Sequence, residues 1–488
     1  MSLNRAAQSL SKTVYPASRI INGIGVSILA VMMFLTSADV ILRYVFNRPI
    51  SGAYEITEWM LGALVAFGLA YTAAHKEHIR IDFVSSRFSP GVQVFLNIIA
   101  ALLGIGIFSL ITWRSIMYAE SLRAGGDITP VLHIPLYPAV WVVVVGGTLF
   151  CLVFMVDLLE NLAQLGVNKR WWPRAGLLLG IVLVMLLLAT PTLGQGILPQ
   201  VSPPTAGLIS ICILIVLLFA GIHIGIVMAL LGFLGMVYVS GIGAGLTTLS
   251  TSPYTTISKY GFSVVPLFIL MGTFCFYSGL SRDLYFTMYR WVGYLPGGLA
   301  MATVWGCAGF AAVCGSSLAT VATMGTVALP EMKRYKYDSR LATGCIAAGG
   351  SIGVLIPPSI ILIIYGILAE QSVGRLFLAG FFPGITEALF YMGTIYILCK
   401  RNPLMGPPGE RANVMERLAS LKGTWGVLAL FILVIGGIYM GVFTPTEAAG
   451  VGAFGAFLFT IGRRKLNWQA FTASLIAVSY THLTLPTN

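Results

Sequence analysis

The sequence has few charged residues. Only 9% of its 488 positions are Asp, Glu, Lys or Arg, whereas 57% are hydrophobic. Soluble domains carry about 25% charged residues, so this composition excludes a large soluble core and indicates a polytopic membrane protein. The formal net charge of +12 is spread over short loops between apolar runs. That distribution follows the positive-inside rule and gives no indication of nucleic-acid binding.

Several kinds of chemistry lack the residues that they need. No Gly-Lys dipeptide occurs, which excludes a Walker A phosphate loop and ATP hydrolysis by this chain. The five histidines are too scattered for a metal cluster, and the seven cysteines contain no Cys-x-x-Cys pair. We therefore predict no cofactor and no enzymatic activity. An intramembrane hydrolase, with a serine and a histidine paired only in the folded chain, is the alternative that stays open.

Four apolar runs occupy the first third of the chain, and each is long enough to cross a bilayer core of roughly 30 Å. They cover residues 20–40, 56–74, 92–113 and 138–159. Lys and Arg are more frequent in the N-terminal segment and in the loops 75–90 and 161–174 than in the loops between them. By the positive-inside rule, we predict that the N-terminus and these two loops are cytoplasmic.

Charged side chains gather at the ends of these four runs. The set is Asp39, Arg43, Glu55, Glu58, His78, Arg80 and Asp82. One interpretation is an active site, and the other is ion pairing at the membrane interface that fixes a scaffold. We favour the scaffold, because carboxylates are functional candidates mainly when they lie deep in the membrane.

A linker is expected at residues 166–205. It contains a basic, Trp-containing segment, an apolar run at 176–189 and a Pro- and Gly-rich stretch that we interpret as an external loop. Two more apolar runs, 206–221 and 226–240, are separated by a short turn that contains His223. We interpret His223 as a turn or packing residue, and a proton relay is the alternative.

The stretch from Gly315 to Gly384 is apolar enough to lie at membrane depth, yet it contains three groups of helix-breaking residues. The groups are Gly315-Ser316-Ser317, Gly349-Gly350-Ser351 and Pro357-Pro358-Ser359. Two adjacent prolines interrupt a helix, and backbone groups freed inside a membrane must find partners in the protein or in a wet cavity. A kinked structural helix is one explanation. Three breaks within about 45 residues favour a transporter binding site, because broken helices mark such sites.

These breaks supply ligands for a sodium ion without a charged residue. The hydroxyls of Ser316, Ser317 and Ser351, together with free carbonyls, are hard oxygen ligands, and helix N-termini attract a carboxylate. We therefore predict one sodium site beside the substrate at the three groups.

A helical hairpin is expected at residues 299–330. Basic residues flank both of its ends, so it would enter and leave the membrane on the cytoplasmic side. Further on, we expect a turn at Pro383-Gly384, an apolar run to Cys399 and a basic cytoplasmic loop at 400–422.

The paired apolar runs at 206–240 and 425–461 have a similar layout and, by charge, opposite orientations. Such a pair is typical of an inverted-topology repeat. The next apolar run, 471–478, is too short to cross a bilayer. We therefore expect that the second repeat is incomplete, that residues 479–488 are a non-native tail, and that the chain as given does not transport.

Motifs at fixed spacing in the later part of the chain resemble the large membrane subunit of tripartite ATP-independent periplasmic (TRAP) transporters. They are Gly-Ser-Ser at 315–317, Pro330-Glu331-Met332, Tyr337, Ile356-Pro357-Pro358-Ser359, Tyr365-Gly366, Gln371-Ser372-Val373-Gly374, Leu376-Phe377, Pro383-Gly384 and Phe443-Thr444-Pro445-Thr446-Glu447-Ala448. Residues 15–165 resemble the small membrane subunit of the same family. The matching pieces are Asp39-Val40-Ile41-Leu42-Arg43-Tyr44, Phe46-Asn47, Glu55 and His78-Ile79-Arg80-Ile81-Asp82.

The resemblance implies an all-α polytopic membrane protein, in which a four-helix scaffold is fused to an inverted-repeat transport domain with a re-entrant helical hairpin and a broken helix. The expected domains are 1–165 for the small subunit, 166–205 for a linker with a fusion helix, and 206–478 for the incomplete large subunit. In the scaffold, Asp39, Arg43, Glu55, His78 and Asp82 are the expected interface residues.

It further implies sodium-coupled, elevator-type uptake of an organic acid, such as a C4-dicarboxylate, in the bacterial inner membrane. A periplasmic solute-binding protein would deliver the substrate, and sodium would be the coupling ion. The alternatives are a non-transporting fragment and an ion-channel-like membrane protein.

Overall fold

The computed structural model describes residues 2–76, 78, 80–165 and 202–484. The apolar run expected to form a fusion helix at 176–189 lies outside these residues. Within them the chain is helical almost throughout, and the only β-type pairing described is an isolated bridge between Ile128 and Pro135. Eight of the described helices are long and apolar enough to cross a membrane. The prediction of an all-α polytopic membrane protein is therefore confirmed.

The chain divides into two compact units. Unit 1 contains Met1–Ile28, Tyr54–Lys259 and Ser479–Asn488, and unit 2 contains Leu29–Ala53 and Tyr260–Val478. The long helix α1 (Ser2–Phe46) contributes its first part to unit 1 and the rest to unit 2. The compact units thus do not follow the boundary that the sequence predicts between the two subunits.

Unit 1 is a helical bundle around an aliphatic and aromatic core. Its helices after α1 are α2 (Ala53–Ala74), the short α3 (Asp82–Ser85), α4 (Pro90–Gly125), α5 (Tyr137–Leu165), α7 (Pro203–Phe219) and α8 (Ile224–Ile257). Helices α4 and α5 pack along each other, with Ile107 and Phe150 among the fully buried side chains between them. Helix α4 starts at a proline after Ser89, where the missing N–H costs no hydrogen bond, and ends at left-handed Gly126.

Helix α8 extends well beyond the apolar run predicted at 226–240. It bends at Gly241, whose φ of 85° lies outside the helical region, and then continues to Ile257. The second part is rich in Gly, Ser and Thr, which gave no apolar signal in the sequence.

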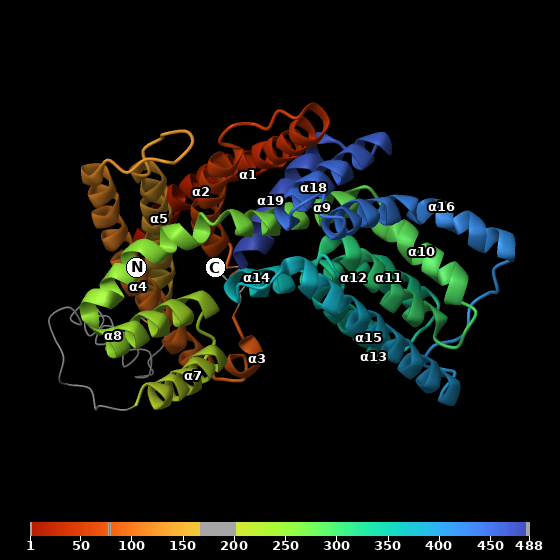
Figure 1. The fold of residues 1–488 in the computed structure, drawn as a ribbon. Coiled ribbons are helices and arrows are strands. Elements are labelled where there is room, and N and C mark those ends of the chain that lie inside the picture. Colours follow the sequence, from red (N-terminus) through yellow and green to blue (C-terminus); the bar gives the residue numbers. More distant parts are fainter. Residues whose placement is uncertain (1, 77, 79, 166–201, 485–488) are drawn as a thin grey trace. The chain divides into compact units, whose positions relative to one another are not determined.

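Unit 2 holds the hairpin and the broken helix (Figure 1). After α1 its elements are η1 (Tyr260–Ser263), α9 (Val264–Tyr277), α10 (Leu280–Val292), α11 (Gly298–Cys314), α12 (Ser317–Arg334), α13 (Ser339–Ser351), η2 (Ile352–Val354), α14 (Ile360–Leu368), α15 (Val373–Arg401), α16 (Val414–Phe431), η3 (Ile432–Gly436), α17 (Gly437–Tyr439), α18 (Pro445–Gly462) and α19 (Trp468–Thr484). We assigned no helix from the sequence to the α10 region. Its buried face includes Leu284 and Tyr285, whereas Arg290 on the other face pairs with Glu416.

Short polar side chains cap the N-termini of α12, α13, α14 and α15 in unit 2. Ser316, Ser359 and Ser372 each accept a hydrogen bond from the backbone N–H three residues later. Asp338 caps α13 in a similar way, with its carboxylate accepting from two N–H groups. The start of each helix around the predicted site is therefore set locally by sequence.

Helices α11 and α12 form the predicted hairpin, and one loop holds both ends of its base. Gly297 N donates to Gly406 O at 2.9 Å, and Asp338 N donates to Met405 O at 3.0 Å. The Tyr337 hydroxyl adds a bond of 2.9 Å to Pro407 O. Both arms of the hairpin therefore begin and end at the same side of unit 2.

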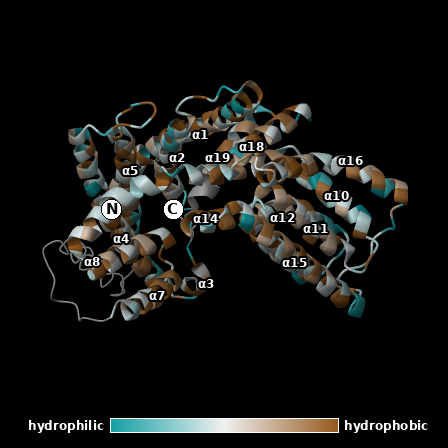
Figure 2. Ribbon diagram, in the orientation of Figure 1, coloured by the Kyte–Doolittle hydropathy of each residue, from teal (hydrophilic) through white to brown (hydrophobic). Residues whose placement is uncertain are grey.

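The turn expected at Pro383-Gly384 is wrong. Both residues lie inside α15, which runs without interruption from Val373 to a hydrophilic C-terminal end at Arg401 (Figure 2). A single proline removes one donor from a helix, and a long membrane helix tolerates this loss when its neighbours satisfy the freed groups. Gly384 packs closely on the broken helix, since an added Cβ would lie 2.8 Å from Ile356.

Candidate functional site

The ends of four helices meet in unit 2 at the tip of the hairpin. Helix α11 ends and α12 begins at Gly315 and Ser316, and α13 with η2 leads through the proline pair into α14. The two pieces are joined directly, because Ile360 N donates to Gly315 O at 3.1 Å. The predicted corner at 315–317 and the predicted break at 357–359 are thus brought together.

This junction is packed backbone against backbone. Gly315 has a φ of +66°, and an added Cβ would lie 2.2 Å from Pro358 O. At Gly350 an added Cβ would lie 2.0 Å from Val321 Cγ2. A Cβ at Gly315 would collide with backbone and one at Gly350 with the Val321 side chain, so both close contacts require glycine. The helix break predicted at 349–351 is displaced, because α13 continues through Gly349 and Gly350 to Ser351 and gives way to η2 at Ile352.

Two helix N-termini point into the junction. Ser316 caps α12 and Ser359 caps α14, and each leaves the positive end of a helix dipole beside the other. The C-terminal ends of α11 and η2 lie there too and supply carbonyl oxygens. An arrangement of this kind can hold an anionic group at the N-termini and a hard cation at the carbonyls.

The predicted sodium ligands do not all face one another. The hydroxyl of Ser317 is buried and has no hydrogen-bond partner among the described residues. Ser316 uses its hydroxyl as a helix cap. The hydroxyl of Ser351 instead contacts Glu387 and Tyr391 of α15. Gly349 packs on Cys307 of α11.

The residues predicted as a scaffold interface fall into separate places. In unit 2, Arg43 lies 3.3 Å from the Asp39 carboxylate and 2.5 Å from Glu447 Oε1. Asp39 also accepts from Ile50 N at 2.7 Å. Glu447 belongs to a capping box with Thr444, in which each side chain bonds the other residue's backbone N–H. We call Asp39, Arg43, Thr444 and Glu447 the lock cluster.

Glu55 lies in unit 1 and stabilises a loop rather than pairing with a basic residue. Its two oxygens accept from Val131 N at 2.7 Å and Leu132 N at 2.9 Å. Beyond the opposite end of α2, Lys76 lies 3.5 Å from Asp157 and 3.3 Å from Glu160. Burial alone would lower the pKa of Lys76, but the two carboxylates outweigh it and raise this pKa.

His78 packs in the core of unit 1. Its ring lies 5.6 Å from that of Phe150 and 6.0 Å from that of His223, measured between centroids. Burial, with a smaller effect from His223, lowers the pKa of His78 to about 4. The loop after α2 and the turn between α7 and α8 are therefore at the same end of unit 1, as the predicted orientation requires. The side chain of Asp82, the fifth predicted interface residue, lies outside the described part of the structure.

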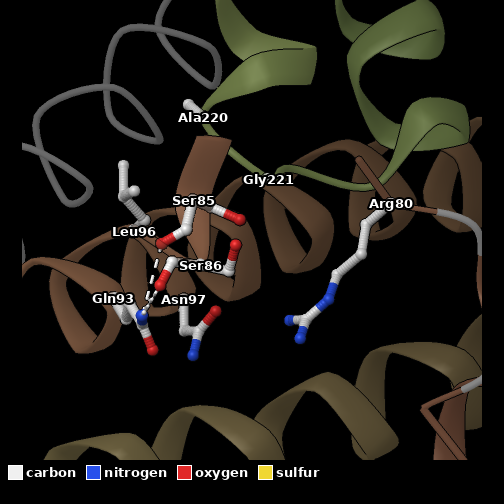
Figure 3. A pocket seen from close by; sticks show the side chains of 8 residues that line it. All are labelled: Arg80, Ser85, Ser86, Gln93, Leu96, Asn97, Ala220 and Gly221. Atoms are coloured by element: carbon white, nitrogen blue, oxygen red, sulfur yellow. Dashed lines mark hydrogen bonds between the residues drawn. The ribbon is translucent and has the colours of Figure 1, made fainter. Parts of the chain in front are cut away.

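Unit 1 also contains a polar pocket of about 200 Å³ (Figure 3). Its lining is Arg80, Ser85, Ser86, Gln93, Leu96, Asn97, Ala220 and Gly221. The Arg80 guanidinium faces the Gln93 and Asn97 side chains across the pocket. Gln93 Nε2 is held by the carbonyls of Ser85 at 3.3 Å and Phe88 at 3.1 Å. None of the predicted sodium or substrate residues lines this pocket.

Two family profiles match the chain. The one described as "Tripartite ATP-independent periplasmic transporter, DctM component" matches residues 211–485, and the one described as "Tripartite ATP-independent periplasmic transporters, DctQ component" matches residues 32–164. The chain belongs to the TRAP transporter family. It therefore combines the small and large membrane components of a TRAP permease in one polypeptide.

Curated relatives give the same assignment. The chain is 28% identical over 458 residues to the isethionate TRAP transporter permease protein DctMQ of Oleidesulfovibrio alaskensis, covering 92% of this chain and 69% of the relative. It is 40% identical over 230 residues to the C4-dicarboxylate TRAP transporter large permease protein DctM of Pseudomonas aeruginosa, covering 45% of this chain and 53% of the relative. The chain thus spans about half the length of the curated large permease protein of this second match.

Two residues of this TRAP permease were missed by sequence reasoning. Glu447 was recognised only as part of a motif, although it is the partner of Arg43, because 404 positions separate the two residues. Glu387 was not singled out at all. A lone carboxylate in the middle of an apolar run was the available signal, since such residues are rare and functional in membranes.

Proposed function

We propose that this chain is the membrane permease of a system for sodium-coupled uptake of a carboxylate-bearing substrate. The observation that carries the proposal is the meeting of four helix ends at the hairpin tip. The N-termini of α12 and α14 offer positive dipole ends to a carboxylate, and the carbonyl ends of α11 and η2 offer oxygens to sodium.

Ser317 is the first sodium ligand that we propose. Its hydroxyl is buried and lacks a hydrogen-bond partner in the described residues, and such a group is costly unless a ligand satisfies it. Gly353 stands close by, where an added Cβ would lie 3.3 Å from Ser317 N. A cation at this point would contact both the hairpin and the broken helix.

Family membership further supports a periplasmic solute-binding protein as partner and the inner membrane as location. We propose the chemical class of the substrate, an organic acid, and no single compound. Names of relatives refer to C4-dicarboxylates, isethionate, sialic acid and ectoine, so a C4-dicarboxylate is one candidate among several. Elevator-type movement of the hairpin with the broken helix would carry the substrate across the membrane.

Uptake into proteoliposomes tests the proposal. Labelled succinate and other carboxylates are offered with the binding protein, with and without a sodium gradient, to residues 1–488 and to a form extended by the C-terminal region of a curated large permease. For the extended form, sodium-dependent uptake that requires the binding protein is the expected result, and the comparison with residues 1–488 tests the expectation that the chain as given does not transport. Uptake that persists without either one contradicts it.

The Ser317→Ala variant tests whether sodium binds at the hairpin tip. Because one ligand oxygen is removed, we expect the sodium concentration for half-maximal uptake to rise at least about fivefold, roughly 1 kcal/mol. Ser372→Ala is the matched control, because Ser372 is also a hydroxyl at a helix start but lies outside the tip. An unchanged sodium dependence in Ser317→Ala removes this residue from the site.

A further inference from the structure

Glu387 lies in the middle of a membrane span. It is fourteen residues from Val373 and fourteen from Arg401, the two ends of α15. At 1.5 Å per residue, the carboxylate is about 21 Å of helix from either end. An ionised carboxylate at this depth is costly, and such residues mark ion or substrate pathways in membrane proteins.

Two hydroxyl groups contact the same oxygen of this carboxylate. Tyr391, one helical turn further along α15, donates to Glu387 Oε1 at 2.7 Å. Ser351, the last residue of α13, donates to the same atom at 2.9 Å. The contact therefore connects the helix break with the centre of α15.

A backbone carbonyl completes a group of four oxygens. Ser351 Oγ lies 2.7 Å from Ala348 O and 3.3 Å from the Tyr391 hydroxyl. The two hydroxyls carry one hydrogen each. The single hydroxyl hydrogen of Ser351 therefore has two acceptors within hydrogen-bond distance, Ala348 O and Glu387 Oε1, and a full hydrogen bond to one leaves the other without it.

No basic side chain neutralises this group. None of the ion pairs found in the described residues involves Glu387. Two other carboxylates in the apolar helices differ: Asp39 pairs with Arg43, and Asp157 pairs with Lys76. Glu55 receives two backbone N–H groups instead. Among the residues that the structure describes, the donors to Glu387 are neutral hydroxyls, and a neutral donor stabilises a carboxylate less than a cation does.

We propose that Glu387, Ser351, Tyr391 and the Ala348 carbonyl bind a small alkali cation of the sodium class. Oxygen ligands of this kind suit hard cations. One carboxylate balances one positive charge, so a monovalent ion gives a neutral complex, whereas a divalent ion would leave a net charge at membrane depth.

The proposed site is separate from the hairpin tip, although it contains Ser351, which we first predicted as a ligand there. The Ser351 hydroxyl contacts α15, whereas Ser317, whose hydroxyl is buried, lies on the hairpin with its backbone against Gly353 of η2. An ion bound at Glu387 would hold the end of α13 against α15. Binding there needs no substrate, so the inference does not depend on the transport proposal.

The test is thermal unfolding of the purified chain in lipid nanodiscs. Sodium chloride is raised while choline chloride is lowered, so that the ionic strength stays constant. Glu387→Gln keeps the shape of the side chain and removes its charge, and Tyr391→Phe removes one ligand oxygen. Glu370→Gln, at an exposed residue in the short segment between α14 and α15, is the matched control.

To isolate the proposed site, all variants are also made in a Ser317→Ala background. Half-maximal stabilisation in that background should need at least about tenfold more sodium in Glu387→Gln and severalfold more in Tyr391→Phe. Glu370→Gln should match its parent. Lithium should replace sodium, and choline should not.

Three outcomes overturn the inference. The first is an unchanged sodium dependence in both Glu387→Gln and Tyr391→Phe. The second is equal stabilisation by choline, and the third is a response of Glu387 to pH with none to sodium. If Glu387→Gln does not fold, Tyr391→Phe decides alone. When the first outcome is accompanied by loss of the sodium response in Ser317→Ala, the site at Glu387 is removed and the hairpin-tip site remains.

Discussion

Glu447 and Glu387 are both carboxylates of unit 2, and they are stabilised in opposite ways. Glu447 is 7% exposed, and its carboxylate accepts from the Arg43 guanidinium and from the backbone N–H of Thr444, at the positive end of its own helix dipole. Glu387 receives two hydroxyls and nothing cationic in the described residues. A carboxylate that serves structure has its charge matched inside the protein. One whose charge is left unmatched is available to a ligand.

The largest effect expected from this difference is at Arg43. Arg43→Ala leaves the Glu447 charge without its guanidinium, and we expect the free energy of unfolding to fall by about 2–3 kcal/mol. This lies between the values for exposed and buried ion pairs, because Arg43 is partly exposed and Glu447 is not. Chemical denaturation in mixed micelles measures it.

The same experiment includes Glu387→Gln in sodium-free buffer as the contrasting variant. Removing an unmatched charge should leave the stability unchanged or raise it slightly. A loss as large as that of Arg43→Ala would mean that Glu387 is a structural carboxylate, and the comparison would fail.

A smaller effect is expected at the capping box of α18. Thr444→Ala removes the hydroxyl that accepts from Glu447 N, which should cost about 1 kcal/mol. In an Arg43→Ala background the same change measures how far the cap and the ion pair support each other. Strictly additive losses would show that the lock cluster is two independent contacts.

The smallest effect concerns Tyr44, which lies next to Arg43 in the sequence. Its hydroxyl donates to Val442 O and its ring packs edge-on against Phe443, with centroids 6.1 Å apart. Tyr44→Phe keeps the ring contact, so we expect a loss of only about 0.5 kcal/mol at this half-exposed position. A loss above that of Thr444→Ala would show that the Tyr44 hydroxyl contributes more to stability than the helix cap beside it does.

Local signals in the sequence were sufficient for the hairpin and the helix break. Gly315, Ser316 and the Pro357-Pro358 pair act on the backbone within a few residues, so their consequence could be predicted without knowing the fold. The same reasoning failed at Pro383, because one proline ends a helix only when its neighbours leave the freed carbonyl unsatisfied. Helix α10 was missed because its charged residues interrupt any continuous apolar run in the sequence, although they lie on the face opposite the buried one.

The contacts of Glu447 and Glu387, which sequence reasoning missed, lie between segments that are distant in the sequence. Arg43 and Glu447 are 404 positions apart, and Ser351 and Glu387 are joined only by the way α13 and α15 pack. The composition indicates that each of these residues lies in an apolar helix or at its end. The local sequence does not indicate which distant side chain it contacts. The direction of the Ser351 side chain, toward α15 rather than the hairpin tip, likewise depends on tertiary packing.

The contact between Ile360 N and Gly315 O restricts how the proposed binding region can open. With no space for a methyl group at Gly315 or Gly350, the hairpin tip and the broken helix fit together as one piece, and neither can swing away without losing a backbone hydrogen bond. The tip is therefore a poor hinge. In the uptake that we propose, the tip and the broken helix would move together, so a covalent crosslink across the tip should leave that uptake unchanged.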